Sequence, residues 1–275
     1  MSLAANGITA RGLRLILASA SPRRRELLTQ AGYSFLVDAA DVDESLRAGE
    51  EAGAYVQRLA VEKAQAVFAR HSSAPHPTHR GEAAMDGAPS AQDVGAPSMT
   101  VSSSWVGSAK LEHLHHYCNA TKSCHSERSE ESPHFARSET HFAIAEPALI
   151  VLGADTSVVL GEEILGKPAD AADARRMLQR LSGKTHRVLT GIAAMTTAGV
   201  LSAVESTEVV FANISDADLD TYCATAEPLD KAGAYGIQGY AARWIPRIDG
   251  CYFNVMGLPI ARVVRLIDEA LANCR

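Results

Sequence analysis

One short segment near the start of the chain combines hydroxyl and guanidinium groups in a pattern that suits an anion. Ser19 and Ser21 are followed by Pro22, Arg23 and Arg24. Ser21 is a typical helix N-cap and Pro22 a typical first helical residue, so a helix is predicted to begin here. Free N–H groups at a helix N-terminus attract anions, whereas arginines in the first turn oppose the helix dipole by about 0.3–1 kcal/mol each. A bound phosphate would offset that cost; a capped helix with solvated arginines is the plain alternative.

Carboxylates occur at two places that could hold a metal ion together with a phosphate. The segment 38–44 contains four acidic residues, among them Glu44, and Asp155 follows the apolar run 149–152. Carboxylate oxygens suit Mg²⁺ or Mn²⁺, which also bind substrate phosphates. An acid at the carboxyl end of a buried strand is where α/β folds place ligand sites, so Asp155 is expected to hold a metal or activate water. The alternatives are a solvated loop for the first group and a turn or helix-capping role for Asp155.

Two lysines have surroundings that suggest contact with an anion. Lys63 falls seven residues after Val56, within the apolar face of a predicted helix. Because lysine is seldom buried without a partner, Lys63 either extends past the edge of the core or meets an anion. Lys167 ends a stretch that nearly fits a P-loop, but Pro168 stands where the Ser or Thr is required, so the P-loop is rejected. Lys167 remains a candidate electrostatic partner for a phosphate.

A loop with three glycines, residues 230–239, contains a side chain that could read a nucleobase. Gln238 offers both a donor and an acceptor, and the glycines would allow the backbone to approach a ligand. The glycine spacing does not match the dinucleotide-binding fingerprint. A plain irregular turn is therefore the alternative for this loop.

The elements that would position these residues alternate between strand and helix. Short apolar runs and alternating patterns predict strands at 13–18, 148–153, 186–195 and 205–212. Helical periodicity and capping residues predict helices at 22–30, 54–68, 174–181, 215–224 and 260–271. Such alternation is typical of an α/β domain in which helices cover a sheet.

Composition changes abruptly in the segment 71–146. It holds nine of the ten histidines and a run rich in Ser, Glu and Arg at 126–132, with no sustained apolar period. Sequence of this kind buries too little apolar area to offset chain entropy. We therefore expect a disordered, low-complexity insertion that interrupts one domain spanning 1–275. The His and Cys residues at 115–125 match no common structural-zinc spacing, so a polar insert is preferred over a metal site.

Charge and cysteine content restrict the partners and the compartment. A formal net charge of -6 argues against nonspecific nucleic-acid binding, which needs a basic surface. Five irregularly spaced cysteines do not form a disulfide framework, which favours a reducing compartment. The apolar run 13–18 is too short to cross a bilayer or to act as a secretion signal. We expect a soluble, cytoplasmic protein that binds neither nucleic acid nor membrane; its oligomeric state is open, with a homodimer among the alternatives.

Eight ordered segments, spread over nearly the whole chain apart from the first dozen residues and the insertion, carry a more specific signal. They are 17–24, 42–44, 59–64, 153–156, 164–168, 182–186, 231–239 and 254–259. Together they resemble the Maf family of nucleotide pyrophosphatases, also called septum-formation proteins. The resemblance implies an elongated α/β fold with a mixed β-sheet flanked by helices, and two lobes with a central cleft.

The resemblance also implies an activity, a cofactor and roles for particular residues. Maf proteins cleave a nucleoside triphosphate to the monophosphate and pyrophosphate, using a divalent cation such as Mg²⁺ or Mn²⁺. Asp155 matches the family's proton acceptor and would hold the metal together with Glu44. Positions that discriminate between substrates match Arg23, Thr156 and Gln238, in the combination of the branch that acts on dTTP and UTP. The other cleft residues are matched by Ser19 and Arg24, which would bind substrate, and by Lys63 and Lys167, which would assist catalysis.

The leading hypothesis is therefore a pyrophosphatase acting on dTTP, UTP or modified pyrimidine nucleotides. A non-catalytic nucleotide-binding regulator of cell division is the alternative from another functional class. A third reading is a copy impaired by the insertion, since the segment 71–146 lies between the helix with Lys63 and the strand leading to Asp155. In the family that connection is short.

Overall fold

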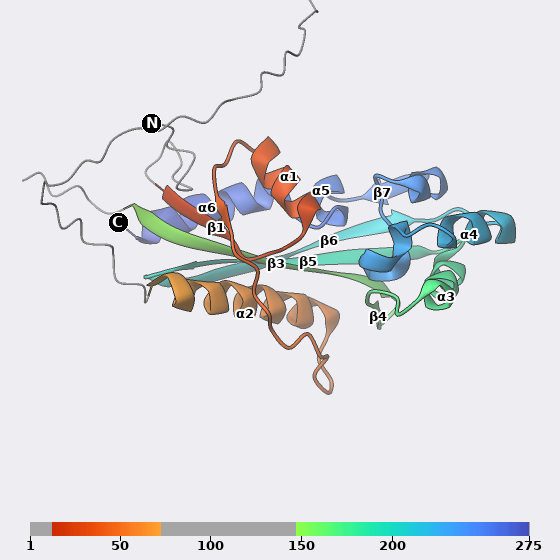
Figure 1. The fold of residues 1–275 in the computed structure, drawn as a ribbon, viewed down its shortest axis with the longest axis horizontal. Coiled ribbons are helices and arrows are strands. Elements are labelled where there is room, and N and C mark those ends of the chain that lie inside the picture. Colours follow the sequence, from red (N-terminus) through yellow and green to blue (C-terminus); the bar gives the residue numbers. More distant parts are fainter. Residues whose placement is uncertain (1–12, 73–146, 275) are drawn as a thin grey trace, which may run out of the picture. The chain divides into compact units, whose positions relative to one another are not determined.

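The computed structural model describes residues 13–72 and 147–274 (Figure 1). The predicted insertion, 71–146, lies outside this part of the chain except for its first two residues, which end helix α2 (Ala52–Ser72). The His and Cys residues at 115–125 also lie outside the described residues. That the segment interrupts a single domain therefore stays a prediction.

A mixed β-sheet forms the centre of the described part, as predicted. Its strand order is β2-β1-β3-β5-β6-β7, with β4 paired to β3. The strands are β1 (Leu13–Leu17), β2 (Leu36–Val37), β3 (Ala148–Leu160), β4 (Glu163–Leu165), β5 (Thr185–Thr196), β6 (Gly199–Val210) and β7 (Arg247–Asp249). The β1 strand pairs in parallel with β2 and β3, and the remaining pairs are antiparallel.

Helices cover both faces of this sheet, because side chains of a strand alternate between its faces. The helices other than α2 are α1 (Pro22–Gln30), α3 (Ala171–Leu181), α4 (Asp216–Cys223), α5 (Tyr252–Val255) and α6 (Ile260–Asn273). On β3, Ile150 and Leu152 belong to the apolar cluster that includes α1 and α6, whereas Val151 packs with Ala60 and Ala64 of α2. Helices α3 and α4 pack in a second large cluster with the short 3₁₀ helices η3 (Ala232–Ala234) and η4 (Tyr240–Trp244). The 3₁₀ helix η2 (Glu227–Asp230) also contacts α3 and α4.

The prediction that a strand ends at residue 153 is wrong. The β3 strand continues to Leu160 because it pairs with β5 along most of its length, from Val151 opposite Met195 to Val159 opposite Arg187. Asp155 therefore lies within a strand rather than after its end, which also excludes a turn or helix-capping role. The strand that ends near Asp155 is the neighbouring β1, whose pairing with β3 stops at Leu152.

Helix α2 lies very close to the sheet because two glycines face it. A Cβ atom on Gly153 of β3 would lie 2.0 Å from the Ala60 carbonyl oxygen, and one on Gly191 of β5 would lie 2.2 Å from the Val56 carbonyl oxygen. Only residues without a side chain allow this approach. The helix is also longer than the predicted 54–68. These two contacts fix how far the side chains of α2 stand from β3.

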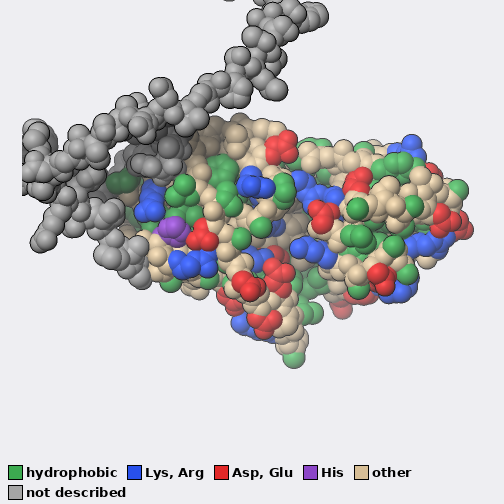
Figure 2. Space-filling view, viewed as in Figure 1, with side chains coloured by type: hydrophobic (Ala, Val, Ile, Leu, Met, Phe, Trp, Pro, Cys, Tyr) green, Lys and Arg blue, Asp and Glu red, His purple; other side chains and the backbone are tan. Residues whose placement is uncertain are grey.

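The surface and the helices add two observations. Lys and Arg side chains are interspersed with Asp and Glu on the face drawn in Figure 2, rather than gathered in a patch of one sign. Of the helices in the described residues, none is at once long enough and apolar enough to span a membrane.

Candidate active site

A cavity of about 560 Å³ opens where β1 ends beside β3. Small-molecule sites typically enclose about 300–1,000 Å³. The wall of this cavity contains all nine candidate residues: Ser19, Arg23, Arg24, Glu44, Lys63, Asp155, Thr156, Lys167 and Gln238. The structure therefore brings together residues from α1 and the turn before it, the loop before α2, α2 itself, β3, the turn before α3 and the 3₁₀ region.

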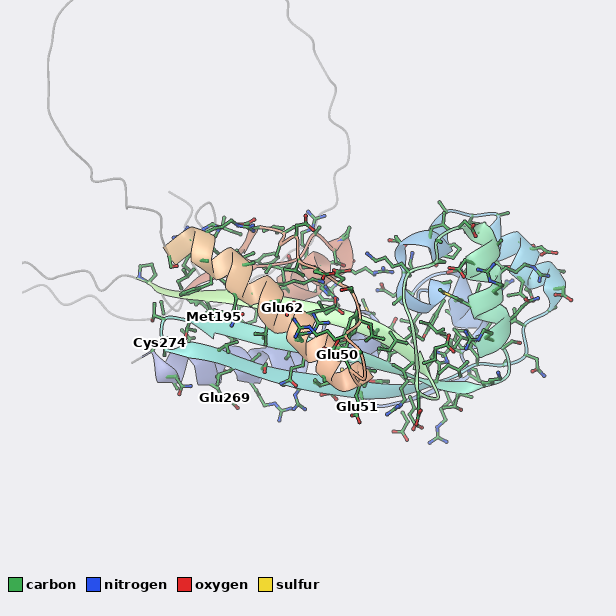
Figure 3. All side chains as sticks on the ribbon, turned by 90° about the horizontal axis from the view of Figure 1, so that it is seen from below. Glu50, Glu51, Glu62, Met195, Glu269 and Cys274 are labelled. Atoms are coloured by element: carbon green, nitrogen blue, oxygen red, sulfur yellow. The ribbon has the colours of Figure 1, made fainter. Side chains whose placement is uncertain are left out.

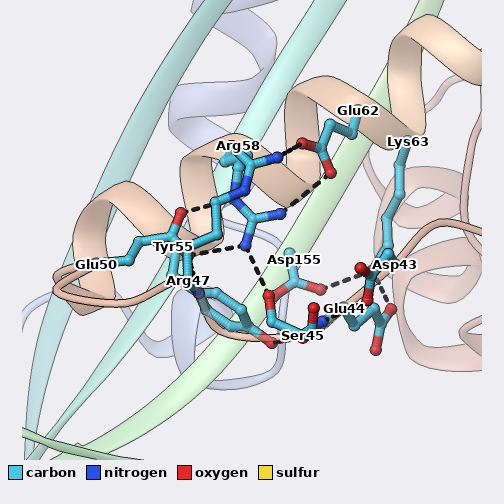
Figure 4. A network of polar contacts seen from close by, with 10 residues as sticks. All are labelled: Asp43, Glu44, Ser45, Arg47, Glu50, Tyr55, Arg58, Glu62, Lys63 and Asp155. Atoms are coloured by element: carbon cyan, nitrogen blue, oxygen red, sulfur yellow. Dashed lines mark hydrogen bonds and ion pairs between the residues drawn. The ribbon is translucent and has the colours of Figure 1, made fainter.

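Lys63 forms the centre of the cavity wall on the α2 side of the sheet. Its Nζ lies 2.7 Å from Asp155 Oδ1 and 2.6 Å from Glu44 Oε1 (Figure 4). The side chains of Lys63 and Asp155 are only 10% and 13% exposed, whereas that of Glu44 is 55% exposed. Of the two alternatives for Lys63, the structure shows contact with anions, which are the carboxylates of Asp155 and Glu44. Its buried position arises because it occupies the apolar face of α2, as its spacing from Val56 predicted.

Electrostatics favour an ionised Glu44. Partial burial alone would raise the pKa of this carboxyl, but the hydrogen bond and charge of Lys63 outweigh that effect. Lys167 and Arg24 add smaller contributions of the same sign, and the pKa of Glu44 is lowered as a result. The cavity therefore presents two carboxylates around one ammonium group.

The opposite face of β3 carries a second polar group, centred on Arg24. Successive side chains of a strand point to opposite faces, so Asp155 meets α2 while Thr156 meets α1. Arg24 donates from Nη2 to Thr156 Oγ1 at 2.9 Å, from Nη1 to the Ala154 carbonyl at 2.8 Å, and from Nε to the Gly257 carbonyl at 2.8 Å. Its Nη1 also donates to Ser19 Oγ at 3.1 Å. Arg24 thus connects the start of α1 to the part of β3 that lies beyond the end of β1. Phosphate binding by Arg24 stays a prediction.

Burial affects Arg24 without removing its charge. Desolvation lowers the pKa of its guanidinium, and the nearby Asp155 and Glu44 carboxylates offset part of this effect. Arginine remains protonated in proteins even when its pKa falls. A partly buried positive charge therefore lies near the two carboxylates, and its hydrogen bonds fix its position.

The third part of the wall is the segment that follows η2. Arg23 Nη2 lies 3.8 Å from Asp230 Oδ2, and Lys231 Nζ lies 2.6 Å from Asp230 Oδ1. Gln238 and Lys167 are exposed and line the same cavity. Arg23 consequently lies beside the glycine loop, while Gln238 leaves its amide accessible to a ligand.

Sequence reasoning missed two cavity residues, Tyr55 and Lys231. Tyr55 lies eight residues before Lys63, about two helical turns along the same side of α2, so helical spacing would have placed it there. Lys231 stands next to Asp230 in the glycine loop and could have been found as a further cation. Beneath that loop, the buried His186 is 2.7 Å from Tyr235 Oη through its Nε2.

The donor set fits a cation that arrives with the substrate. Mg²⁺ is commonly bound by one or two carboxylates together with substrate phosphates, and Glu44 and Asp155 provide such a pair. Within residues 13–72 and 147–274, no cluster of three or more His, Cys, Asp or Glu side chains forms a metal site by itself. The residues therefore suit a shared metal–phosphate site rather than a permanent metal centre.

Comparison with known proteins gives a consistent result. The sequence profile described as "Maf-like protein" matches residues 14–87 and 104–270, which include all nine candidate residues. The chain is 38% identical over 259 residues to the dTTP/UTP pyrophosphatase of Koribacter versatilis (strain Ellin345), covering 94% of this chain and 95% of the relative. It is 37% identical over 261 residues to the dTTP/UTP pyrophosphatase of Anaeromyxobacter dehalogenans (strain 2CP-C), covering 94% of each chain. A third dTTP/UTP pyrophosphatase, from Symbiobacterium thermophilum, is 37% identical over 256 residues and is covered to 93%.

Proposed function

The chain belongs to the Maf-like protein family, and on that premise we propose that it hydrolyses nucleoside triphosphates to the monophosphate and pyrophosphate. The proposed substrates are dTTP, UTP and modified pyrimidine nucleotides, following the activity named for its relatives. The single observation that supports this best is the buried Lys63 ammonium between Asp155 and Glu44, inside a cavity that also exposes Arg23 and Lys167.

The chemistry requires a water oxygen to attack the α-phosphorus of the triphosphate. Asp155 accepts a proton from that water, the new P–O bond forms, and the bond from the α-phosphorus to the bridging oxygen breaks. The electron pair of the broken bond leaves with pyrophosphate. Lys63 orients the Asp155 carboxylate, and Arg23 and Lys167 neutralise the charge on the departing phosphates.

We also propose that a divalent cation, Mg²⁺ or Mn²⁺, would be held by Glu44 and Asp155 together with the substrate phosphates. When bound, such a cation would polarise phosphoryl oxygens and lower the pKa of a coordinated water. Glu44 is more than half exposed, so its carboxylate is accessible from the cavity. Lys63 holds both carboxylates close to one another.

Substrate selection is assigned to Arg23, Thr156 and Gln238. Gln238 is exposed at the cavity wall and can donate to and accept from the edge of a base. The Thr156 hydroxyl accepts from Arg24 and lies 3.0 Å from Thr190 Oγ1, so it supports the phosphate side of the cavity. Arg23 lies at the start of α1 beside the glycine loop, and so between the phosphate side of the cavity and the side with Gln238.

The decisive experiment is the conversion of Asp155 to Asn. Asp155→Asn keeps the shape of the side chain but removes the proton acceptor, so pyrophosphate release from dTTP should be lost while the circular dichroism spectrum stays the same. Asp249→Asn, on the exposed strand β7 outside the cavity wall, is the matched control and should keep full activity. Unchanged turnover by Asp155→Asn would remove this residue from the mechanism.

The same preparation separates the enzyme from a non-catalytic nucleotide-binding regulator. A regulator would bind dTTP in a calorimetric titration without producing dTMP. A pyrophosphatase produces dTMP and pyrophosphate in equal amounts. The full complement of catalytic groups around one cavity favours the enzyme.

A further inference from the structure

We propose that Tyr55 and Arg58 of α2 are positioning residues that hold the backbone at residues 44–45, so that Glu44 faces Lys63 and Asp155. This inference rests on the proposed function, because it assigns Glu44 a part in the reaction. It adds two residues that neither sequence reasoning nor the family resemblance identified as part of the catalytic apparatus.

The first observation is that α2 contacts two successive carbonyl groups of the loop. Tyr55 Oη donates to the Glu44 carbonyl at 2.8 Å, and Arg58 Nη2 donates to the Ser45 carbonyl at 3.1 Å (Figure 4). Residues three apart on a helix lie on the same side, so both donors reach the loop together. The backbone directly after the Glu44 side chain is thereby fixed to the helix that also carries Lys63.

The second observation is that Arg58 is itself firmly held. Its Nε and Nη2 donate to the two carboxylate oxygens of Glu50 at 2.6 and 2.8 Å, and its Nη1 donates to Glu62 at 3.2 Å. Such bidentate contact depends on the planar guanidinium, and the Arg58 side chain is only 12% exposed. Glu50 lies beside the first turns of α2 and Glu62 farther along the helix, as the view from below shows (Figure 3).

The same carboxylates also bind the loop from its other end. Arg47 Nη2 donates to Glu62 at 2.9 Å, and the Arg47 backbone N–H donates to Glu50 at 3.1 Å. Glu50 and Glu62 therefore join Arg58 of the helix to Arg47 of the loop. The network holds residues 44–50, although this segment forms neither helix nor strand.

Glu44 needs this support because its own side chain provides little. It is 55% exposed and reaches Lys63 across the cavity, so the direction of the carboxylate depends on where its backbone lies. Asp155, in contrast, is fixed by the pairing of β3. Of the two carboxylates, Glu44 is the one whose position the loop controls.

The test compares Tyr55→Phe, Arg58→Lys and the double variant with the wild-type chain. Tyr55→Phe removes only the hydroxyl, and Arg58→Lys keeps the charge but not the fork that joins Glu50 to the loop. Arg175→Lys is the control, because Arg175 joins Asp216 and Asp220 outside the cavity wall. Hydrogen–deuterium exchange is measured without nucleotide or metal, and dTTP turnover is measured as a function of Mg²⁺ and dTTP.

In the double variant, we expect exchange of the amides in residues 43–50 to rise by about tenfold, the scale of one or two lost hydrogen bonds. At saturating dTTP, kcat should fall by about tenfold and the half-saturating Mg²⁺ concentration should rise, because Glu44 no longer faces Lys63. The KM for dTTP at saturating Mg²⁺ should stay within about twofold, since Arg23 and Lys167 are unchanged. Arg175→Lys should behave as wild type in both measurements.

Two outcomes would overturn the proposal. If exchange in residues 43–50 does not rise, Tyr55 and Arg58 do not hold the loop. If exchange rises while kcat and the Mg²⁺ dependence stay the same, the loop does not position a reacting group. A wild-type chain that binds dTTP but releases no pyrophosphate would instead refute the proposed function, whatever the exchange result. The Tyr55→Phe variant keeps the test usable if Arg58→Lys fails to fold.

Discussion

Replacing Gly153 with alanine should separate α2 from the sheet and slow the reaction. The new Cβ would lie 2.0 Å from the Ala60 carbonyl oxygen and 3.0 Å from the Ala64 backbone nitrogen. Both are backbone atoms of α2, so no side-chain rotation relieves the contact. The helix must move by at least about 1 Å to restore an ordinary separation. Overpacking of this kind typically costs about 1–3 kcal/mol of unfolding free energy.

The same movement affects the chemistry because α2 carries Lys63. A displacement of about 1 Å stretches the 2.7 Å contact between Lys63 Nζ and Asp155 Oδ1, and misplacement on that scale can lower kcat by about a hundredfold. The flexible lysine side chain can recover part of the distance, so kcat should fall by roughly tenfold to a hundredfold. Gly191→Ala should act in the same way, because its Cβ would lie 2.2 Å from the Val56 carbonyl oxygen.

The matched control is Gly53→Ala in α2 itself. A Cβ at this position meets nothing within 4 Å, so the change should be neutral or should stabilise by up to about 1 kcal/mol through helix propensity. Urea unfolding gives the free energies, and dTTP turnover gives kcat for all three variants. If Gly153→Ala matched Gly53→Ala in both stability and kcat, the close approach of α2 would not be what positions Lys63.

Two further predictions concern acid stability and the long connection. Burial lowers the pKa of His186 to about 4. As the pH falls below 6.5, the unfolded chain binds a proton on this histidine, whereas the folded chain binds it only near pH 4. The free energy of unfolding should therefore fall by about 3 kcal/mol as the pH drops from 6.5 to about 4. Urea unfolding of His186→Gln should show a correspondingly smaller loss over the same pH range. Replacing residues 73–146 with a short Gly/Ser linker should leave the kcat for dTTP unchanged, because the cavity residues already converge in the full chain; a large rise would show that this segment impairs the enzyme.

Local signals in the sequence predicted the elements that carry most of the site. Helix α1 begins at Pro22 after an N-cap at Ser21, as expected from residue types that act within one turn. Lys63 lies on the buried face of α2 because helical periodicity depends only on spacing. The convergence of nine candidate residues on one cavity came from the family resemblance, since no local pattern states which distant segments meet.

What the sequence could not predict depends on partners far along the chain. The apolar run before Asp155 ends at Gly153, so a strand end was inferred, yet pairing with β5 extends β3 by another seven residues to Leu160. Gly153 has a role that no local pattern indicated, which is to admit the backbone of α2. The hydrogen bonds from Arg24 to two acceptors on β3 and one after α5 had no local signal in the sequence either. Each of these facts requires knowing which segment packs opposite.

The long connection between α2 and β3 is compatible with the site because it is attached far from Lys63 and Asp155. Lys63 lies nine residues before Ser72, about 14 Å along the axis of α2 at 1.5 Å per residue. Asp155 lies seven residues after Ala148, about 23 Å along β3 at 3.3 Å per residue. The pair is held by the contacts of α2 with β3 at Gly153 and with β5 at Gly191, and not by the link that joins α2 and β3 in sequence. A connection attached that far along two paired elements can change in length without moving Lys63 relative to Asp155, whereas a single added methyl group at Gly153 cannot.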